Sequence, residues 1–263
     1  MMKLAFSTLG CPNWQWREIF AAAKDLGVDG IEIRGIEKEM YAPRVRIFDE
    51  ANREATLEQL SQAGSALTQL TSGATLGMPD SPQAGRQEIL DYVDMAQKLG
   101  VPYIRVMISP QPGPEPVDLE QGRKLYLELC RHAKTKGICL LIETNGALAD
   151  SRVMREFMDG SDPESAGVLW DIHHPYRFFN ETPEFTFRNI GRYIKNTHVK
   201  DSVFKDGKIA YRMMGYGDVP IFDALKTLKG AGYQGFITLE WTRSEETRLN
   251  SSHIATSRMP SSA

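Results

Sequence analysis

The sequence predicts an α/β fold, a (β/α)8 TIM barrel formed by one domain. Eight short apolar runs alternate with amphipathic segments along about 240 residues, a length that suits a closed barrel. Helical crossovers between successive strands make those strands parallel. The alternative, a doubly wound open sheet, needs a glycine-rich first turn, and "STLGCPNW" is not G-x-G-x-x-G.

The predicted strands are short apolar runs bounded by turn residues or by helical patterns. In chain order they are KLAFST (3–8), GIEIR (30–34), ALTQLTS (66–72), YIRVMI (103–108), ICLLIE (138–143), GVLWDI (167–172), IKNTHVK (194–200) and GFITLE (235–240).

The segments between these strands have apolar residues at helical spacing. WREIFAAAKDLG ends at Gly27, RQEILDYVDMAQKLG at Gly100 and GRKLYLELCRHAKTKG at Gly137. Each glycine suits the left-handed position that follows a helix. VPIFDALKTLKGAG repeats the pattern before the last strand, whereas residues 148–158 have the weakest helical pattern of the chain.

Composition excludes several classes of protein. A net charge of −3 and a pI near 6.0 give no reason to expect nucleic acid or an anionic membrane as partner. No apolar run approaches the roughly 20 residues of a membrane helix, and the N-terminus has no secretory signal pattern. Three scattered cysteines form no CxxC motif, so we expect reduced thiols and a cytoplasmic location.

Residues that can bind a metal ion stand where four of the predicted strands end. Glu143, Asp171 and Glu240 each finish a strand, and His198 lies near the end of another. Active sites of barrels lie at these carboxyl ends, and alternation along a strand directs one face into the barrel. Three carboxylates and one imidazole suit Mn²⁺, Mg²⁺, Co²⁺ or Zn²⁺. Because burying three carboxylates without a cation is costly, the sequence predicts one divalent metal ion.

Five stretches in this order resemble one known family: LGVDGIEIR, LLIETN, WDIHHP, NTHVKD and MGYGDVPIFDALKTLKGAGYQGFITLEW. The family is that of the xylose isomerase-like TIM barrels, sugar or sugar-phosphate isomerases and epimerases. The resemblance extends over nearly the whole chain to Trp241. It implies a single divalent ion bound by Glu143, Asp171, His198 and Glu240.

The resemblance also implies a reaction, the transfer of a proton next to a carbonyl of a small keto-sugar or polyol through an enediolate. Glu143 and Glu240 would be the acid/base pair. The same ligands leave open an inosose dehydratase-like lyase and a hydroxypyruvate isomerase-like enzyme. An endonuclease IV-like phosphodiesterase would need more than the five histidines present and a basic face. A non-catalytic sugar-binding barrel is a further alternative.

The candidate substrate contacts are His174, Lys200, Glu32, Arg34 and Arg105. The resemblance implies the first two, whereas the last three could equally form a salt-bridge layer inside the barrel. For His173 we consider a structural role and metal ligation, and we prefer the structural role. We expect Asp201 to orient its loop, and "GYG" (215–217) is either an anion-binding nest or a simple turn.

The barrel is expected to span residues 1–242, because residues 243–263 lack its apolar periodicity. These last residues resemble the translation of a sequencing-library adapter, and we interpret them as a non-native, disordered tail. The final helix that covers strands eight and one in this family would then be missing. We expect exposed apolar surface and a tendency to aggregate. Related enzymes are often oligomers, so a homo-oligomer is possible.

Overall fold

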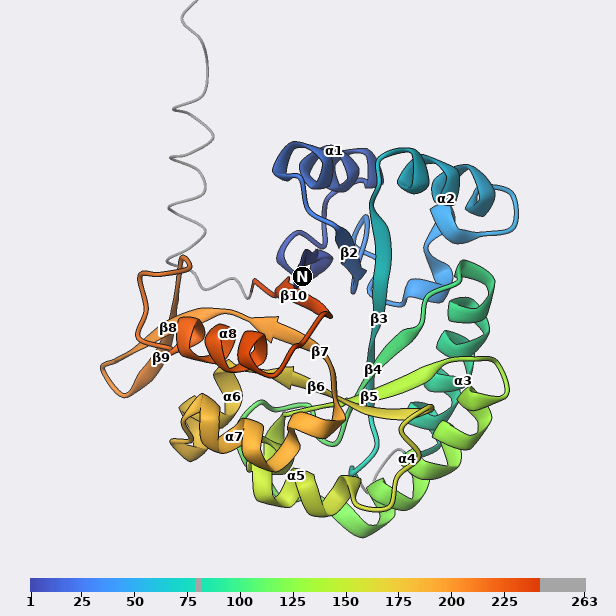
Figure 1. Cartoon of the computed structure of the whole chain (residues 1–263). Helices are drawn as coiled ribbons and strands as arrows, with labels where there is room; N and C mark the ends of the chain where they lie inside the picture. Colours follow the sequence, from blue (N-terminus) through green and yellow to red (C-terminus); the bar gives the residue numbers. More distant parts are fainter. Residues whose placement is uncertain (79–81, 242–263) are drawn as a thin grey trace, which may run out of the picture.

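Eight parallel strands close into a barrel in the computed structural model, which describes residues 1–78 and 82–241 (Figure 1). Around the barrel the strands follow the order β1-β10-β7-β6-β5-β4-β3-β2. They are β1 (Lys3–Ser7), β2 (Gly30–Ile33), β3 (Ala66–Thr75), β4 (Tyr103–Met107), β5 (Cys139–Glu143), β6 (Ala166–Asp171), β7 (Ile194–Val199) and β10 (Phe236–Leu239). All eight predicted strands and the (β/α)8 fold are confirmed.

Helices surround the barrel and connect successive strands (Figure 1). The α-helices are α1 (Trp16–Leu26), α2 (Arg53–Gln62), α3 (Pro82–Leu99), α4 (Leu119–Lys134), α5 (Ser151–Met158), α6 (His173–Phe179), α7 (Pro183–Ile190) and α8 (Ile221–Gly230). Short 3-10 helices are η1 (Thr8–Gly10), η2 (Ala42–Arg44), η3 (Arg46–Phe48), η4 (Gly146–Ala149) and η5 (Gly191–Tyr193). None of the helices in the described ranges is long and apolar enough to span a bilayer.

The predicted helix ends are confirmed by backbone geometry. Gly27, Gly100 and Gly137 have φ angles of 62°, 67° and 72°, the left-handed conformation that glycine adopts without strain. The weakly patterned stretch 148–158 does contain a helix, α5. Asp150 is the N-cap of this helix, and its side chain accepts a hydrogen bond from the backbone N–H of Arg152.

A β-hairpin that we did not predict follows β7. It consists of β8 (Asp201–Lys205) and β9 (Lys208–Arg212), which pair antiparallel. Asp206 and Gly207 form its turn, with φ angles of 51° and 75°. Two positive φ angles in succession are typical of the type I′ turn, for which Asp-Gly is a preferred sequence. The crossover from β6 to β7 also contains two short helices, α6 and α7, in place of one.

The interior of the barrel changes from apolar to polar along the strands. Cys139, Leu141 and Leu169 form a small buried cluster inside it. Glu143 is two residues beyond Leu141 and therefore points to the same side of β5. Ile237, on the opposite face of its strand from Glu240, belongs to the main core between strands and helices. This alternation directs the polar side chains toward the mouth of the barrel, as predicted.

Among the described residues, apolar side chains of β1 and α1 are exposed beside β10. Leu4 of β1 is 56% exposed and Leu26 of α1 is 71% exposed. A cavity of about 200 Å³ with an apolar lining, which includes Leu239 and Trp241, lies beside them. Within the described ranges β10 is the last element. The interpretation of residues 243–263 and the missing final helix concern a part of the chain outside those ranges.

Candidate metal centre

Four side chains predicted as metal ligands meet at the carboxyl ends of four adjacent strands. Glu143 and Asp171 end β5 and β6, His198 lies in β7, and Glu240 directly follows β10. One potential ligand atom from each lies within 4.8 Å of the other three, and all four residues are buried. The strand register explains this, since Asp171 pairs with His198 across β6 and β7.

His198 directs one ring nitrogen into the cluster. Its Nδ1 lies 3.3 Å from Oε1 of Glu240 and 3.6 Å from Oε1 of Glu143, and it has no hydrogen-bond partner. Its Nε2 lies 2.7 Å from Oε2 of Glu32. A carboxylate only accepts hydrogen bonds, so in the neutral ring Nε2 carries the hydrogen and Nδ1 has the lone pair. A buried lone pair facing two carboxylates fits a metal ion.

Two cationic side chains hold the carboxylates of the cluster. The Arg105 Nε donates to Oε2 of Glu143 at 2.7 Å. The Lys200 Nζ donates to Oε2 of Glu240 at 2.5 Å, and also to Oδ2 of Asp171. Both glutamates therefore have one oxygen on a cation and the other facing His198.

These charges do not balance. Four carboxylates contact Arg105, Lys200 or His198. They are Glu32, Glu143, Asp171 and Glu240. When His198 is neutral, as metal binding through Nδ1 requires, only Arg105 and Lys200 offset them and an excess of two negative charges remains; a proton on the ring reduces that excess to one. A divalent cation would neutralise that excess, and the donor set of carboxylate and imidazole suits such an ion.

The pKa values follow from these contacts. Burial alone would raise the pKa of Glu143, but Arg105 and His198 outweigh it, so this pKa lies well below its usual range. In the same way Lys200 and His198 outweigh burial and lower the pKa of Glu240 to about 2. Burial opposes a charge on His198, yet Glu32 and Glu240 hold the pKa of its ring well above the ordinary value. Both glutamates are therefore ionised at neutral pH.

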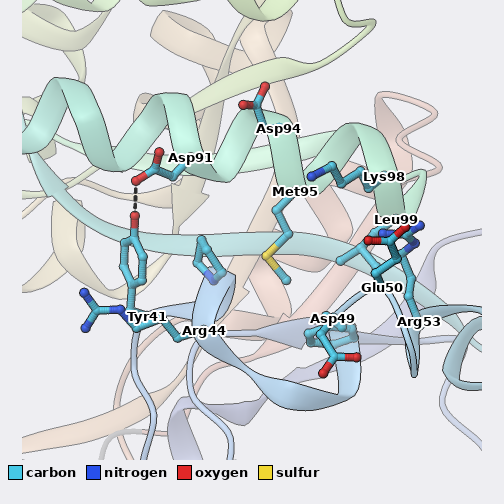
Figure 2. Close-up of a pocket in the computed structure, with 12 residues that line it drawn as sticks. Tyr41, Arg44, Asp49, Glu50, Arg53, Asp91, Asp94, Met95, Lys98 and Leu99 are labelled. Atoms are coloured by element: carbon cyan, nitrogen blue, oxygen red, sulfur yellow. Dashed lines mark hydrogen bonds between the residues drawn. The ribbon is translucent and has the colours of Figure 1, made fainter.

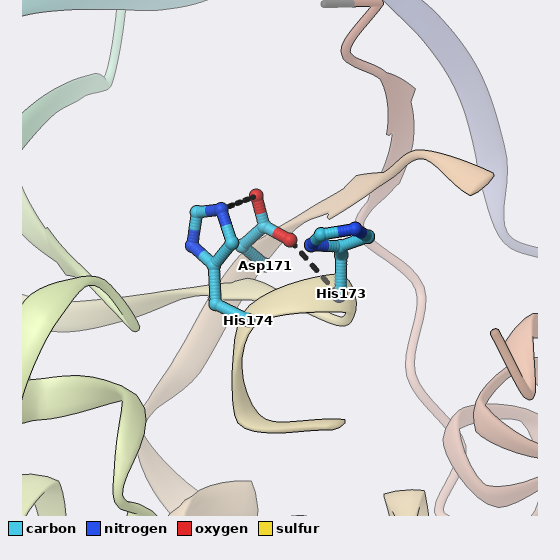
Figure 3. Close-up of side chains that lie close together, drawn as sticks. All are labelled: Asp171, His173 and His174. Atoms are coloured by element: carbon cyan, nitrogen blue, oxygen red, sulfur yellow. Dashed lines mark hydrogen bonds and ion pairs between the residues drawn. The ribbon is translucent and has the colours of Figure 1, made fainter. Parts of the chain in front are cut away.

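His174 places a second imidazole beside Asp171 (Figure 3). Its Nδ1 lies 2.9 Å from the carbonyl oxygen of Thr144, which only accepts, so Nδ1 carries the hydrogen. Its Nε2 lies 3.5 Å from Oδ2 of Asp171. Burial lowers the pKa of His174, so the ring is neutral and Nε2 is an acceptor.

His173 connects Asp171 to the hairpin. Its backbone N–H donates to Oδ1 of Asp171 at 2.9 Å, as Figure 3 shows. Its Nε2 lies 2.9 Å from the hydroxyl oxygen of Ser202, and its ring stacks on Tyr211. Asp171, His173 and His174 form a second group of potential ligands, but Lys200 already pairs with the shared aspartate. These contacts favour the structural role for His173.

Three further residues were candidate substrate contacts: Glu32, Arg105 and Arg34. The first two pair with residues of the cluster. Glu32 is fully buried against His198, and Arg105 is buried against Glu143. This arrangement corresponds to the alternative reading of a salt-bridge layer. Arg34 is half-buried, and its Nη1 donates to the carbonyl oxygen of Met40 at 2.9 Å.

The GYG turn encloses a carboxylate of the chain itself. Oδ2 of Asp201 accepts hydrogen bonds from the backbone N–H groups of Gly215 and Gly217, both at 2.9 Å. A Cβ atom at position 217 would lie 1.9 Å from Oδ1 of Asp201. Asp201 therefore orients this loop, as predicted, and these two N–H groups are not free to bind a phosphate.

Sequence reasoning missed two residues that support the site. The Thr144 hydroxyl accepts from the backbone N–H of Asp171 at 2.9 Å, while its carbonyl holds His174. Gln69 donates to Oε2 of Glu32 at 2.9 Å. The signal was present for both, since Thr144 directly follows the candidate ligand Glu143 and Gln69 interrupts an apolar strand.

A cavity of about 540 Å³ lies elsewhere, between α3 and the segment 41–53 outside the barrel (Figure 2). Its lining mixes acidic and basic side chains, including Asp91, Asp94 and Lys98. The hydroxyl of Tyr41 donates to Asp91 across one end of it. It contains none of the predicted site residues, so its volume alone does not make it the site of chemistry.

Fold and site together define a (β/α)8 barrel with a carboxylate and histidine centre at the carboxyl ends of its strands. The chain belongs to the family of xylose isomerase-like TIM barrels, because the sequence model of that family matches residues 20–257. The resemblance inferred from the motifs is thus confirmed at the level of the family.

Several known proteins are similar to this chain. The fructoselysine 3-epimerase of Escherichia coli O157:H7 is 24% identical over 252 residues, which cover 91% of this chain and 90% of the epimerase. D-psicose 3-epimerase of Clostridium cellulolyticum H10, solved with D-tagatose, has a TM-score of 0.72 at 18% identity, with 91% and 84% of the two chains covered. The IOLI protein, solved with a zinc atom, has a TM-score of 0.75 at 18% identity, with 99% and 100% covered.

Proposed function

We propose that the protein is a divalent-metal-dependent sugar epimerase or isomerase. It would transfer a proton at the carbon next to a carbonyl of a small keto-sugar or polyol, through an enediolate. Membership of the family and similarity to sugar epimerases support the class of substrate. The observation that carries the proposal is the matching environment of Glu143 and Glu240. Each has one oxygen facing His198 Nδ1 and the other held by a cation.

Glu143, Asp171, Glu240 and Nδ1 of His198 would hold the ion. When bound, a divalent ion supplies Lewis-acid stabilisation of the negative charge that develops on the carbonyl and hydroxyl oxygens of the substrate.

The two glutamates would exchange the proton with the substrate carbon. One carboxylate would remove it. The other would first take up a proton from solvent or from a substrate hydroxyl and then give it to the carbon on the opposite face, so that epimerisation results. Arg105 and Lys200 keep both groups ionised before substrate arrives. The free Nε2 of His174 would accept a hydrogen bond from a substrate hydroxyl. Arg34 remains our candidate for a further hydroxyl contact.

Single substitutions test the assignment of the acid/base pair. Glu143→Gln and Glu240→Gln remove the proton acceptor while keeping the size of the side chain. We expect kcat/KM to fall by about 10²–10⁴-fold for each variant, the usual contribution of a general acid or base. The assay is a screen of keto-sugars, inososes and hydroxypyruvate with Mn²⁺, Mg²⁺, Co²⁺ or Zn²⁺, with solvent deuterium incorporation as the readout.

The matched control is Glu128→Gln, which makes the same change in a half-exposed glutamate that pairs with Arg86 on the outer surface. It should keep full activity. Near wild-type turnover by folded Glu143→Gln or Glu240→Gln protein would remove the acid/base assignment. A product that has lost water would replace the isomerase proposal with a lyase, while sugar binding without deuterium incorporation would indicate a binding protein.

A further inference from the structure

A chain of hydrogen bonds crosses the interior of the barrel next to the candidate metal centre. Asn196 of β7 donates through Nδ2 to Oε1 of Gln69 in β3, at 3.1 Å. Gln69 donates through Nε2 to Oε2 of Glu32 in β2, at 2.9 Å, and His198 reaches the same oxygen at 2.7 Å. All four side chains are fully buried.

The direction of every hydrogen bond in this chain is determined. Oδ1 of Asn196 accepts the backbone N–H of Thr197 at 3.0 Å, which fixes the orientation of the Asn196 amide. Its NH₂ group must therefore face the carbonyl oxygen of Gln69, and the NH₂ group of Gln69 must face Glu32. The chain ends on a carboxylate oxygen that accepts from Gln69 and from His198.

We propose that Glu32 is a positioning residue that fixes the ring orientation and the tautomer of His198, and so sets the affinity of the centre for its cation. Gln69 and Asn196 hold Glu32 in place. The inference rests on the proposed metal centre, and it assigns Glu32 to His198 in place of the substrate. Histidine ligands commonly donate their second N–H to a carboxylate, which orients the ring and makes it a better ligand.

A purely structural role explains Glu32 less well. Its Oε1 is buried and has no hydrogen-bond partner. An ionised carboxylate with an unpartnered oxygen is costly inside a protein, whereas a neutral glutamine could accept from His198 at lower cost. Ordering a ligand for a cation provides a reason to keep the charge at this position.

Metal titration of the protein without substrate tests the inference. We expect Glu32→Gln and Glu32→Ala to bind Mn²⁺ or Co²⁺ about 10–100-fold more weakly than wild type, as measured by calorimetry. Gln69→Leu should weaken binding less, because Glu32 keeps its charge. Glu181→Gln is the matched control. It changes a buried glutamate that accepts from Ser151 and Thr186 outside the centre, and its metal affinity should be unchanged.

Nitrogen NMR of the Zn²⁺-loaded wild-type protein with ¹⁵N-labelled histidine gives a result that does not depend on any variant. We expect His198 to carry a hydrogen on Nε2 and to bind the ion through Nδ1. Coordination through Nε2 would overturn the proposal, as would wild-type metal affinity in folded Glu32→Gln and Glu32→Ala. If the Glu32 variants had an increased KM and an unchanged metal affinity, Glu32 would be a substrate-binding residue and the proposal would be wrong. Because no sugar is needed, failure of the substrate screen leaves this result intact.

Discussion

At the scale of single residues, the centre depends on which nitrogen of His198 is free. In the metal-free protein Glu32 and Glu240 raise the pKa of this ring well above its ordinary value. The ring therefore holds a proton at neutral pH, and a cation that binds Nδ1 must displace it.

Metal affinity should consequently rise with pH. Since the raised pKa means that a proton leaves on binding, each unit of pH lost between about pH 8 and pH 6 should weaken binding by up to about tenfold. Calorimetry in buffers of different ionisation enthalpy measures the protons released per ion. A dissociation constant that is independent of pH over this range, with no proton release, would show that His198 is not a ligand.

The sequence predicted which residues form the candidate centre because their positions follow from two simple rules. Barrel strands end at the mouth, and alternate side chains point inward, so Glu143, Asp171, His198 and Glu240 are expected to meet there once the strands are located. The supporting contacts were not predictable in this way. That Gln69 would reach Glu32 depends on the shift of register between β2 and β3, which no pattern within a single strand reveals.

At the scale of secondary-structure elements, Asp201 and the loop that follows the hairpin form one unit. Oδ1 of Asp201 accepts the backbone N–H of Ser202 at 2.9 Å, while Oδ2 accepts those of Gly215 and Gly217. The buried carboxylate of Asp201 thus connects the start of the hairpin, at Ser202, to the loop that follows it, at Gly215 and Gly217. Lys200, which pairs with Asp171 and Glu240, directly precedes Asp201 in the chain.

Replacing Asp201 by alanine should loosen this loop. Several buried or half-buried N–H groups would lose a charged acceptor, and each such bond contributes roughly 1.5–3 kcal/mol. We expect a lower free energy of unfolding and faster amide exchange at residues 213–219. Gly217→Ala should have a similar effect, because its Cβ would collide with Asp201. Unchanged exchange in both variants would contradict this account of the loop.

The β8–β9 hairpin was not predicted from the sequence. The β8 and β9 strands have five residues each, with a charged residue at both ends and an apolar run of only two or three residues between them. The Asp206-Gly207 turn was the available signal, and it stands directly between two such segments. The barrel pattern assigns residues after β7 to a crossover, so an insertion there is easily overlooked.

At the scale of the whole molecule, we expect the exposed apolar side chains of β1 and α1 to promote self-association. Leu4 and Leu26 are largely exposed there, beside the apolar cavity that includes Trp241. Exposed apolar surface of this kind favours association.

Leu26→Lys should reduce self-association. Leu26 ends α1, where a positive charge also interacts favourably with the helix dipole. We expect less light scattering at high protein concentration and a smaller average mass in size-exclusion chromatography, with no change in metal affinity. Equal scattering by the variant and wild type would mean that association uses another surface.

Lys200 also bears on how the barrel acquires its cation. By joining Asp171 to Glu240, its ammonium group holds together carboxylates that would otherwise repel each other during folding. Structural zinc sites lack such a resident counter-charge, and their chains unfold when a chelator removes the ion. We therefore expect the polypeptide to assemble first and to be loaded with a cation afterwards. The supply of metals in the cell would then decide which ion is bound, and one ion would be able to replace another without refolding.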